Sequence, residues 1–162
     1  MRPRTPAGEK PLTQRSLARS ALWHLGRRAL TTAELRARLQ KKAARHPPHP
    51  ESTAWIEALV VRLSSSLILD DARVVHGRIE SARARGWSRC RIEQKLRGVD
   101  SDVKDQAFAA VDAPSLQAEL DAALIYAQKK RLAQKEPRKA LAALARQGFS
   151  FSTAQAALKA GS

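Results

Sequence analysis

The chain has 162 residues, of which 43% are hydrophobic and only 4% aromatic, and its formal net charge at pH 7 is +15. A single cysteine excludes an internal disulfide and fits a reducing cytosol, and this hydrophobic content excludes a wholly disordered chain. So large a cationic excess repels itself unless an anionic partner is near. The charge therefore indicates nucleic acid or a nucleoprotein as partner, with a surface tuned only for solubility as the alternative.

Alanine and leucine dominate the apolar residues, which favours packed helices over sheets. Residues 1–13 contain three prolines and no apolar periodicity, and we interpret them as a flexible basic arm. Three helices are then predicted over residues 14–69. Their signals are an apolar stripe from Leu17 to Leu25, a capping box at Thr31 and Glu34, the proline-rich break "HPPHP" at 46–50, and a stripe from Trp55 to Leu63.

The same order of three helices recurs over residues 70–113 and again over residues 114–161. The second helix of each group carries an apolar pair four residues apart, at Leu35–Leu39, Ile92–Leu96 and Ala140–Leu144. Units of this size bury too little apolar area to be secure alone, so neighbours should stack. The predicted fold is all-α, with three tandem three-helix repeats stacked into an elongated, curved array.

Three blocks of the sequence resemble the RecX family, the bacterial regulators of RecA recombinase. They are "HLGRRALTTAELRARLQKKA", "LILDDARVVHGRIESARARGWSRCRIEQKL" and "LARQGFSFSTAQAAL", in the family's order and at the family's separations. The sequence departs from the family pattern in two places. In "KLRGVD" the family usually has two more residues between the leucine and the glycine, and at the position of Ser88 the family often has glycine.

The resemblance implies a helical regulator that lies in the groove of the RecA–DNA filament and inhibits ATP hydrolysis and strand exchange. Such a protein would modulate homologous recombination, DNA repair and the SOS response. We expect a cytoplasmic monomer without a membrane span that binds the RecA nucleoprotein filament. Contacts with single- and double-stranded DNA through phosphates are a further expectation. The family has no catalytic residues.

The middle repeat places basic side chains on two neighbouring predicted helices. Arg78 and Arg85 share a flank of one helix, and Arg91 and Lys95 share a flank of the next. The four could form a cluster that binds phosphates or carboxylates, or could simply line a solvated helix face. Trp87, which follows directly after Gly86, is expected to pack at the junction of the two helices.

A second candidate contact surface lies on the first helix, where Arg15, Arg19 and Trp23 fall opposite the apolar stripe. An exposed tryptophan beside cations is a plausible contact hot spot. Packing of Trp23 against the next repeat or the N-terminal arm is the alternative.

Other polar residues are expected to be structural, so neither a metal nor a cofactor is predicted. Asp70 and Asp71 enter a helix and should cap it, while His46 and His49 lie in a proline-rich loop without further ligands. No glycine-rich phosphate loop is present, and an enzyme is not expected. A redox role for Cys90 stays open.

The competing hypothesis is a helix-turn-helix-like protein that acts on DNA directly, with residues 88–96 as its recognition helix. That segment offers arginine and almost no asparagine or glutamine. Contacts with phosphates are therefore favoured over readout of bases.

Overall fold

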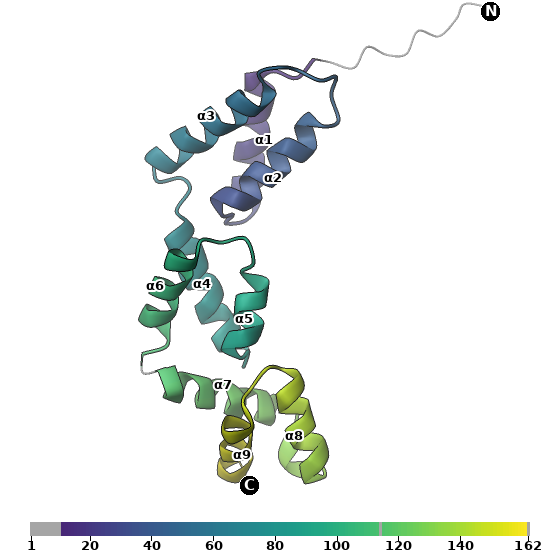
Figure 1. Cartoon of the computed structure of the whole chain (residues 1–162), viewed down its shortest axis with the longest axis vertical. Coiled ribbons are helices and arrows are strands. Elements are labelled where there is room, and N and C mark those ends of the chain that lie inside the picture. Colours follow the sequence, from purple (N-terminus) through teal and green to yellow (C-terminus); the bar gives the residue numbers. More distant parts are fainter. Residues whose placement is uncertain (1–10, 114, 162) are drawn as a thin grey trace, which may run out of the picture. The chain divides into compact units, whose positions relative to one another are not determined.

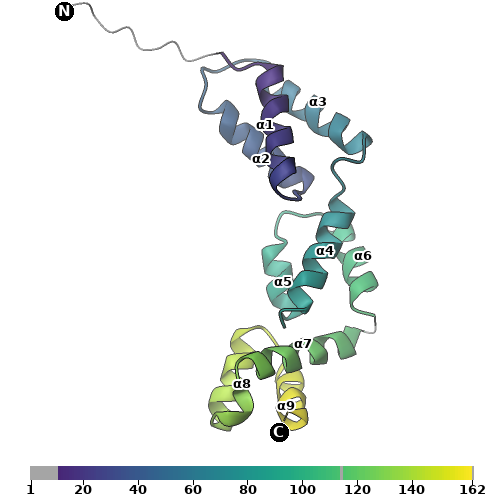
Figure 2. The same cartoon turned by 180° about the vertical axis from the view of Figure 1, so that it is seen from behind.

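The computed structural model describes residues 11–113 and 115–161. Within these ranges the regular elements are nine α-helices and one short 3₁₀-helix, with no strand (Figures 1 and 2). The all-helical prediction is therefore confirmed. The chain separates into two compact units, the first ending at Val74 and the second beginning at Val75.

Three helices form the first unit, and each contacts the other two. In Figure 1 they are drawn in purple to blue: α1 (Gln14–Arg27), α2 (Thr32–Ala43) and α3 (Ser52–Ser65). The predicted capping box opens α2, because the Thr31 hydroxyl accepts the Glu34 N–H at 3.3 Å and the Glu34 carboxylate accepts the Thr31 N–H at 3.1 Å. The proline-rich break separates α2 from α3 as expected.

The end of the predicted arm belongs to the folded unit. Residues 1–10 lie outside the described part of the chain, but Leu12 is only 4% exposed and joins the first hydrophobic core. Thr13 caps α1 by accepting the Ser16 N–H at 3.1 Å. Leu12 and Leu17 occupy the two positions of a hydrophobic staple, which fixes how the chain enters the helix. The prediction of an arm over residues 1–13 is therefore corrected at this end.

Asp70 and Asp71 both serve helix N-termini, but of different helices. The Asp70 carboxylate accepts the Arg73 N–H at 2.9 Å, at the start of α4 (Asp71–Arg83). The Asp71 carboxylate instead accepts the N–H of Thr32 at 2.7 Å and its hydroxyl at 3.0 Å, at the start of α2. Capping is thus confirmed for Asp70, whereas Asp71 caps a helix that begins 39 residues earlier.

The second unit holds most of α4 and all later elements. These are α5 (Arg89–Lys95), α6 (Ser101–Val111), α7 (Ser115–Lys129), η1 (Leu132–Gln134), α8 (Pro137–Arg146) and α9 (Phe151–Ala160). Its buried residues form two clusters, one from α4 to α6 and one from α7 to α9. The apolar pairs Ile92–Leu96 and Ala140–Leu144 are at most 3% exposed, as the sequence predicts.

Gly86 brings the C-terminal end of α4 against the backbone of α7. Its φ of +76° is left-handed, the geometry predicted for a glycine that ends a helix. A Cβ at this position would lie 2.7 Å from the Tyr126 nitrogen and 2.9 Å from the Ala122 oxygen. Only glycine therefore allows this approach without a shift of the backbone.

Candidate surfaces for an anionic partner

Two of the predicted arginines meet at one aromatic ring in the second unit. The guanidinium carbon of Arg85 lies 4.8 Å from the centroid of the Trp87 ring, and that of Arg91 lies 4.1 Å from it. Trp87 is half-buried and packs against the α4–α6 core, as expected for a residue at this junction. Arg91 also donates a hydrogen bond to the Gln147 side chain at the end of α8. We call Arg85, Trp87 and Arg91 the Trp87 cluster.

The other two predicted cations of the middle region are placed differently. Arg78 is half-buried on α4, about two turns before Arg85. Lys95 is exposed at the end of α5 and makes no ion pair with another residue in the described ranges. Only Arg85 and Arg91 are joined at a common ring by the contacts described above, and the partner-binding role of all four residues stays a prediction.

Two neighbouring arginines are paired with carboxylates within the second unit. Arg83 forms an ion pair with Asp112 and a second one with Glu119, whose oxygen lies 2.6 Å from the guanidinium. Burial alone would lower the pKa of Arg83, but its hydrogen bonds and charge interactions with the two carboxylates outweigh this and raise the pKa. Arg89 pairs with Glu93 at 2.8 Å and Asp105 at 3.5 Å. Fewer cations are therefore available to a partner than the sequence suggests.

The first unit carries a surface that the sequence patterns did not reveal. A hollow of about 710 Å³ lies between α1 and the C-terminal part of α2, and none of its lining residues is a carboxylate. We call it the basic hollow; it is lined by Ser20, Trp23, His24, Arg38, Lys41, Lys42, Arg45 and His46. Its four lysines and arginines follow each other at i, i+3, i+4 and i+7, a helical spacing that was legible in the sequence.

Trp23 lines the basic hollow and is 57% exposed. The Arg27 guanidinium lies 4.9 Å from the centroid of its indole ring. Arg15 and Arg19 are also exposed on α1, but neither lines the hollow. Trp23 is therefore largely exposed on the first unit, and both the binding role of these three residues and the alternative packing of Trp23 stay predictions.

His24 reports the electrostatic character of the basic hollow. Burial lowers its pKa below the ordinary value, and the positive charges of Arg38, Arg28 and Lys42 lower it further. Nδ1 of His24 lies 3.3 Å from a guanidinium nitrogen of Arg38. Because that nitrogen can only donate, Nδ1 accepts, which fits a neutral imidazole.

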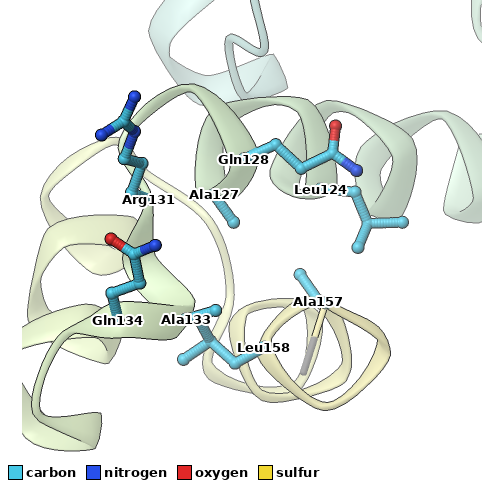
Figure 3. A pocket seen from close by; sticks show the side chains of 9 residues that line it. Leu124, Ala127, Gln128, Arg131, Ala133, Gln134, Ala157 and Leu158 are labelled. Carbon is cyan, nitrogen blue, oxygen red and sulfur yellow. The ribbon is translucent and has the colours of Figure 1, made fainter.

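An apolar pocket of about 250 Å³ lies between α7, η1 and α9. Figure 3 shows Leu124, Ala127, Ala157 and Leu158 around the space, with Arg131 and Gln134 together at one side. Typical small-molecule sites measure about 300–1,000 Å³. This pocket is smaller than that range, and three polar side chains, Gln128, Arg131 and Gln134, are among its lining residues.

Among the residues that the structure describes, no three histidine, cysteine or carboxylate side chains gather as a metal site would require. The His49 ring instead lies 4.2 Å from that of Trp55. Cys90 is an exposed free thiol.

Among the described residues, no helix has both the length and the apolar character needed to cross a membrane.

Comparison with known proteins assigns the chain to a family. No family model matches the chain. In an alignment 168 residues long, however, it is 37% identical to the regulatory protein RecX of Myxococcus xanthus (strain DK1622). The alignment covers 94% of this chain and 89% of that protein, so the similarity includes both units and is not confined to one motif. On the strength of this nearly full-length relationship, the chain belongs to the RecX family.

Proposed function

We propose that this protein is an inhibitor of RecA recombinase that binds in the groove of the RecA–DNA filament and restrains ATP hydrolysis and strand exchange. It would thereby modulate homologous recombination, DNA repair and the SOS response as a cytoplasmic monomer. The observation that carries the proposal is the 37% identity to a regulatory protein RecX over 94% of the chain.

The Trp87 cluster supports binding to a polyanionic assembly. Contact with the indole ring holds the guanidinium groups of Arg85 and Arg91 in place before a partner arrives. Arginine's planar fork binds carboxylates and phosphates through paired hydrogen bonds, and a held side chain loses less entropy on binding. Acidic protein surfaces and DNA phosphates of the filament are therefore suitable partners for this cluster.

We also propose that the chain is an elongated, curved array of three repeats, over residues 14–69, 70–113 and 114–161. Three separate hydrophobic clusters, from α1–α3, α4–α6 and α7–α9, support this division. An array of this kind could bridge neighbouring RecA subunits and hinder the motions that hydrolysis and strand exchange require.

The direct test measures the DNA-dependent ATPase of RecA with increasing amounts of the protein. We expect progressive inhibition that saturates when the filament is covered. An unchanged ATPase rate at saturating protein would contradict the proposal.

A charge-reversal variant then tests the middle region. Arg85→Glu with Lys95→Glu changes two exposed residues, so the fold should be retained. The variant should need a higher concentration for half-inhibition than Lys135→Glu with Arg138→Glu, which changes the net charge equally at two exposed positions elsewhere. Equal inhibition by both variants would remove the Trp87 cluster and Lys95 from the interface.

The alternative, a helix-turn-helix-like DNA-binding protein, has less support from the geometry of α5. Arg89 is paired with Glu93 and Asp105. This helix has only seven residues, and its arginines suit phosphates better than base edges. Sequence-preferring binding to free duplex DNA, with no effect on RecA, would favour the alternative.

A further inference from the structure

We infer that the basic hollow binds single-stranded nucleic acid, with backbone phosphates at Arg38, Lys41, Lys42 and Arg45 and an unpaired base against Trp23. This inference rests on the proposed function, because it assigns the nucleic-acid part of the filament to a named site.

Three cations of the hollow lie on the C-terminal part of α2, and Arg45 follows in the turn directly after this helix. Arg45 is seven positions after Arg38, a spacing that corresponds to at most about 10 Å if the helical rise continues through the turn at residues 44–45. Successive phosphates of one strand rise by about 3.4 Å in B-form DNA and lie farther apart in an extended strand. This spacing is therefore long enough for about two or three phosphates.

No carboxylate within the lining competes for these cations. Lys41 and Arg45 are exposed and make no side-chain hydrogen bond or ion pair with another residue of the described chain. Lys42 donates one hydrogen bond to the Ser16 carbonyl at 3.1 Å, which fixes its position and leaves further N–H groups available. Burial lowers the pKa of His24, and the positive charges of Arg38, Arg28 and Lys42 lower it further, which fits a positive environment in the hollow.

The exposed ring of Trp23 favours a single strand over a duplex. More than half of the Trp23 side chain is exposed, in a hollow whose other lining residues are polar or charged apart from the aliphatic parts of their side chains. An exposed indole beside cations is what proteins use to stack bases while the backbone follows a positive groove. Bases in a duplex are already stacked and paired, so they cannot offer a face to this ring without unstacking.

The experiment measures binding of a fluorescently labelled oligo(dT), by anisotropy and without RecA, at several salt concentrations. The variant Lys41→Ala with Arg45→Ala removes two cations of the hollow. Its matched control, Lys135→Ala with Arg138→Ala, also removes one exposed lysine and one exposed arginine. Each change lowers the net charge from +15 to +13.

We expect the hollow variant to bind more weakly and to reduce the slope of log K against log salt by about 1.4, which is about 0.7 for each lost phosphate contact. The control should keep the slope of the unchanged protein. Equal losses in the two variants would overturn the inference, because binding would then follow net charge and not this site.

Trp23→Ala tests the stacked base. It should weaken oligo(dT) binding by about five- to 150-fold, the effect of losing one stacked base, and Trp23→Phe should restore much of it. Binding of a duplex of equal length should change little. Unchanged oligo(dT) binding by Trp23→Ala would overturn the single-strand assignment.

These measurements separate the inference from the proposed function. Site-specific binding of oligo(dT) together with an unaffected RecA ATPase would leave the inference standing and remove the proposed function. Inhibition of the ATPase together with equal oligo(dT) binding by the hollow and control variants would leave the proposed function standing and remove the inference.

Discussion

Arg83 in the second unit and the basic hollow in the first unit place cations in opposite surroundings. In the second unit, Arg83 lies between Asp112 and Glu119 with only 10% of its side chain exposed. In the first unit, the four lysines and arginines of the basic hollow face a lining without a carboxylate. A net charge of +15 therefore does not show where the protein can bind an anion.

The difference has a structural cause. Arg83 is at the end of α4, where α6 ends and α7 begins, and its two partner carboxylates come from these neighbours. Its cation thus holds three helices of the second unit together. The cations of the basic hollow lie in and just after the C-terminal part of α2, and none of the residues that line this hollow is acidic. The buried cation Arg83 is neutralised by carboxylates, whereas the cations of the basic hollow remain available to a partner.

The largest expected effect comes from Arg83→Ala, which should lower the free energy of unfolding of the second unit by about 3–5 kcal/mol. The change leaves the carboxylate of Asp112, a residue that is 3% exposed, without its cation. Urea denaturation followed by circular dichroism measures the loss.

Arg36→Ala in the first unit is the matched control. Arg36 pairs with Glu57 at 2.7 Å, but the two side chains are 36% and 43% exposed. Surface pairs of this kind contribute about 0.2–1 kcal/mol. Equal costs for the two substitutions would show that the ion pairs of the two units do not differ as described.

A smaller effect is expected from glycine substitutions. Gly86→Ala in the second unit should cost more than about 2 kcal/mol, because a left-handed φ and a collision with the α7 backbone add together. Gly98→Ala shares the positive φ but has nothing within 4 Å of the added Cβ, so it should cost only about 1–2 kcal/mol.

In the first unit, substitution of Gly26, inside α1, should raise stability and not lower it. A Cβ there meets nothing within 4 Å and the residue is helical, so Gly26→Ala should raise stability by about 0.4–1 kcal/mol. Thermal denaturation of the three variants compares them directly. A cost at Gly86 no greater than that at Gly98 would contradict the close approach of α7.

The smallest effect concerns His24 in the basic hollow. Its pKa is below the ordinary value in the folded protein, so the unfolded chain takes up this proton first as the pH falls. This histidine therefore makes stability rise with pH through the interval between its folded pKa and 6.5. Arg38→Ala removes one of the charges responsible and should raise the pKa of His24.

Titration of the His24 ring by NMR measures this shift, and Arg62→Ala, at an exposed position on α3, serves as the control. Oligo(dT) bound in the hollow should raise the same pKa. A pKa of His24 that neither Arg38→Ala nor oligo(dT) changes would mean that the hollow is not the positive site described.

Much of the local structure was predictable from short sequence signals. The capping box at Thr31 and Glu34, the break at 46–50 and the glycine that ends α4 were each confirmed. The apolar pairs of the second helices are buried as predicted. These features depend on residues within a few positions of each other, so a single sequence contains them.

Contacts between distant residues were not predictable in this way. Asp71 caps a helix 39 positions away, and Arg83 finds its carboxylates 29 and 36 positions away. Leu12 was assigned to the arm because only the core shows that it is covered. The spacing of the cations of the basic hollow was visible in the sequence, but only the structure shows that they line a hollow without a carboxylate.

The sequence by itself determined that this protein is helical, strongly cationic and similar to RecX, because periodicity, charge and motif order are properties of the chain. The tertiary structure alone decided which arginines are neutralised and which face solvent. That choice depends on the distances between helices and on their burial, which set whether a carboxylate lies within reach of each cation.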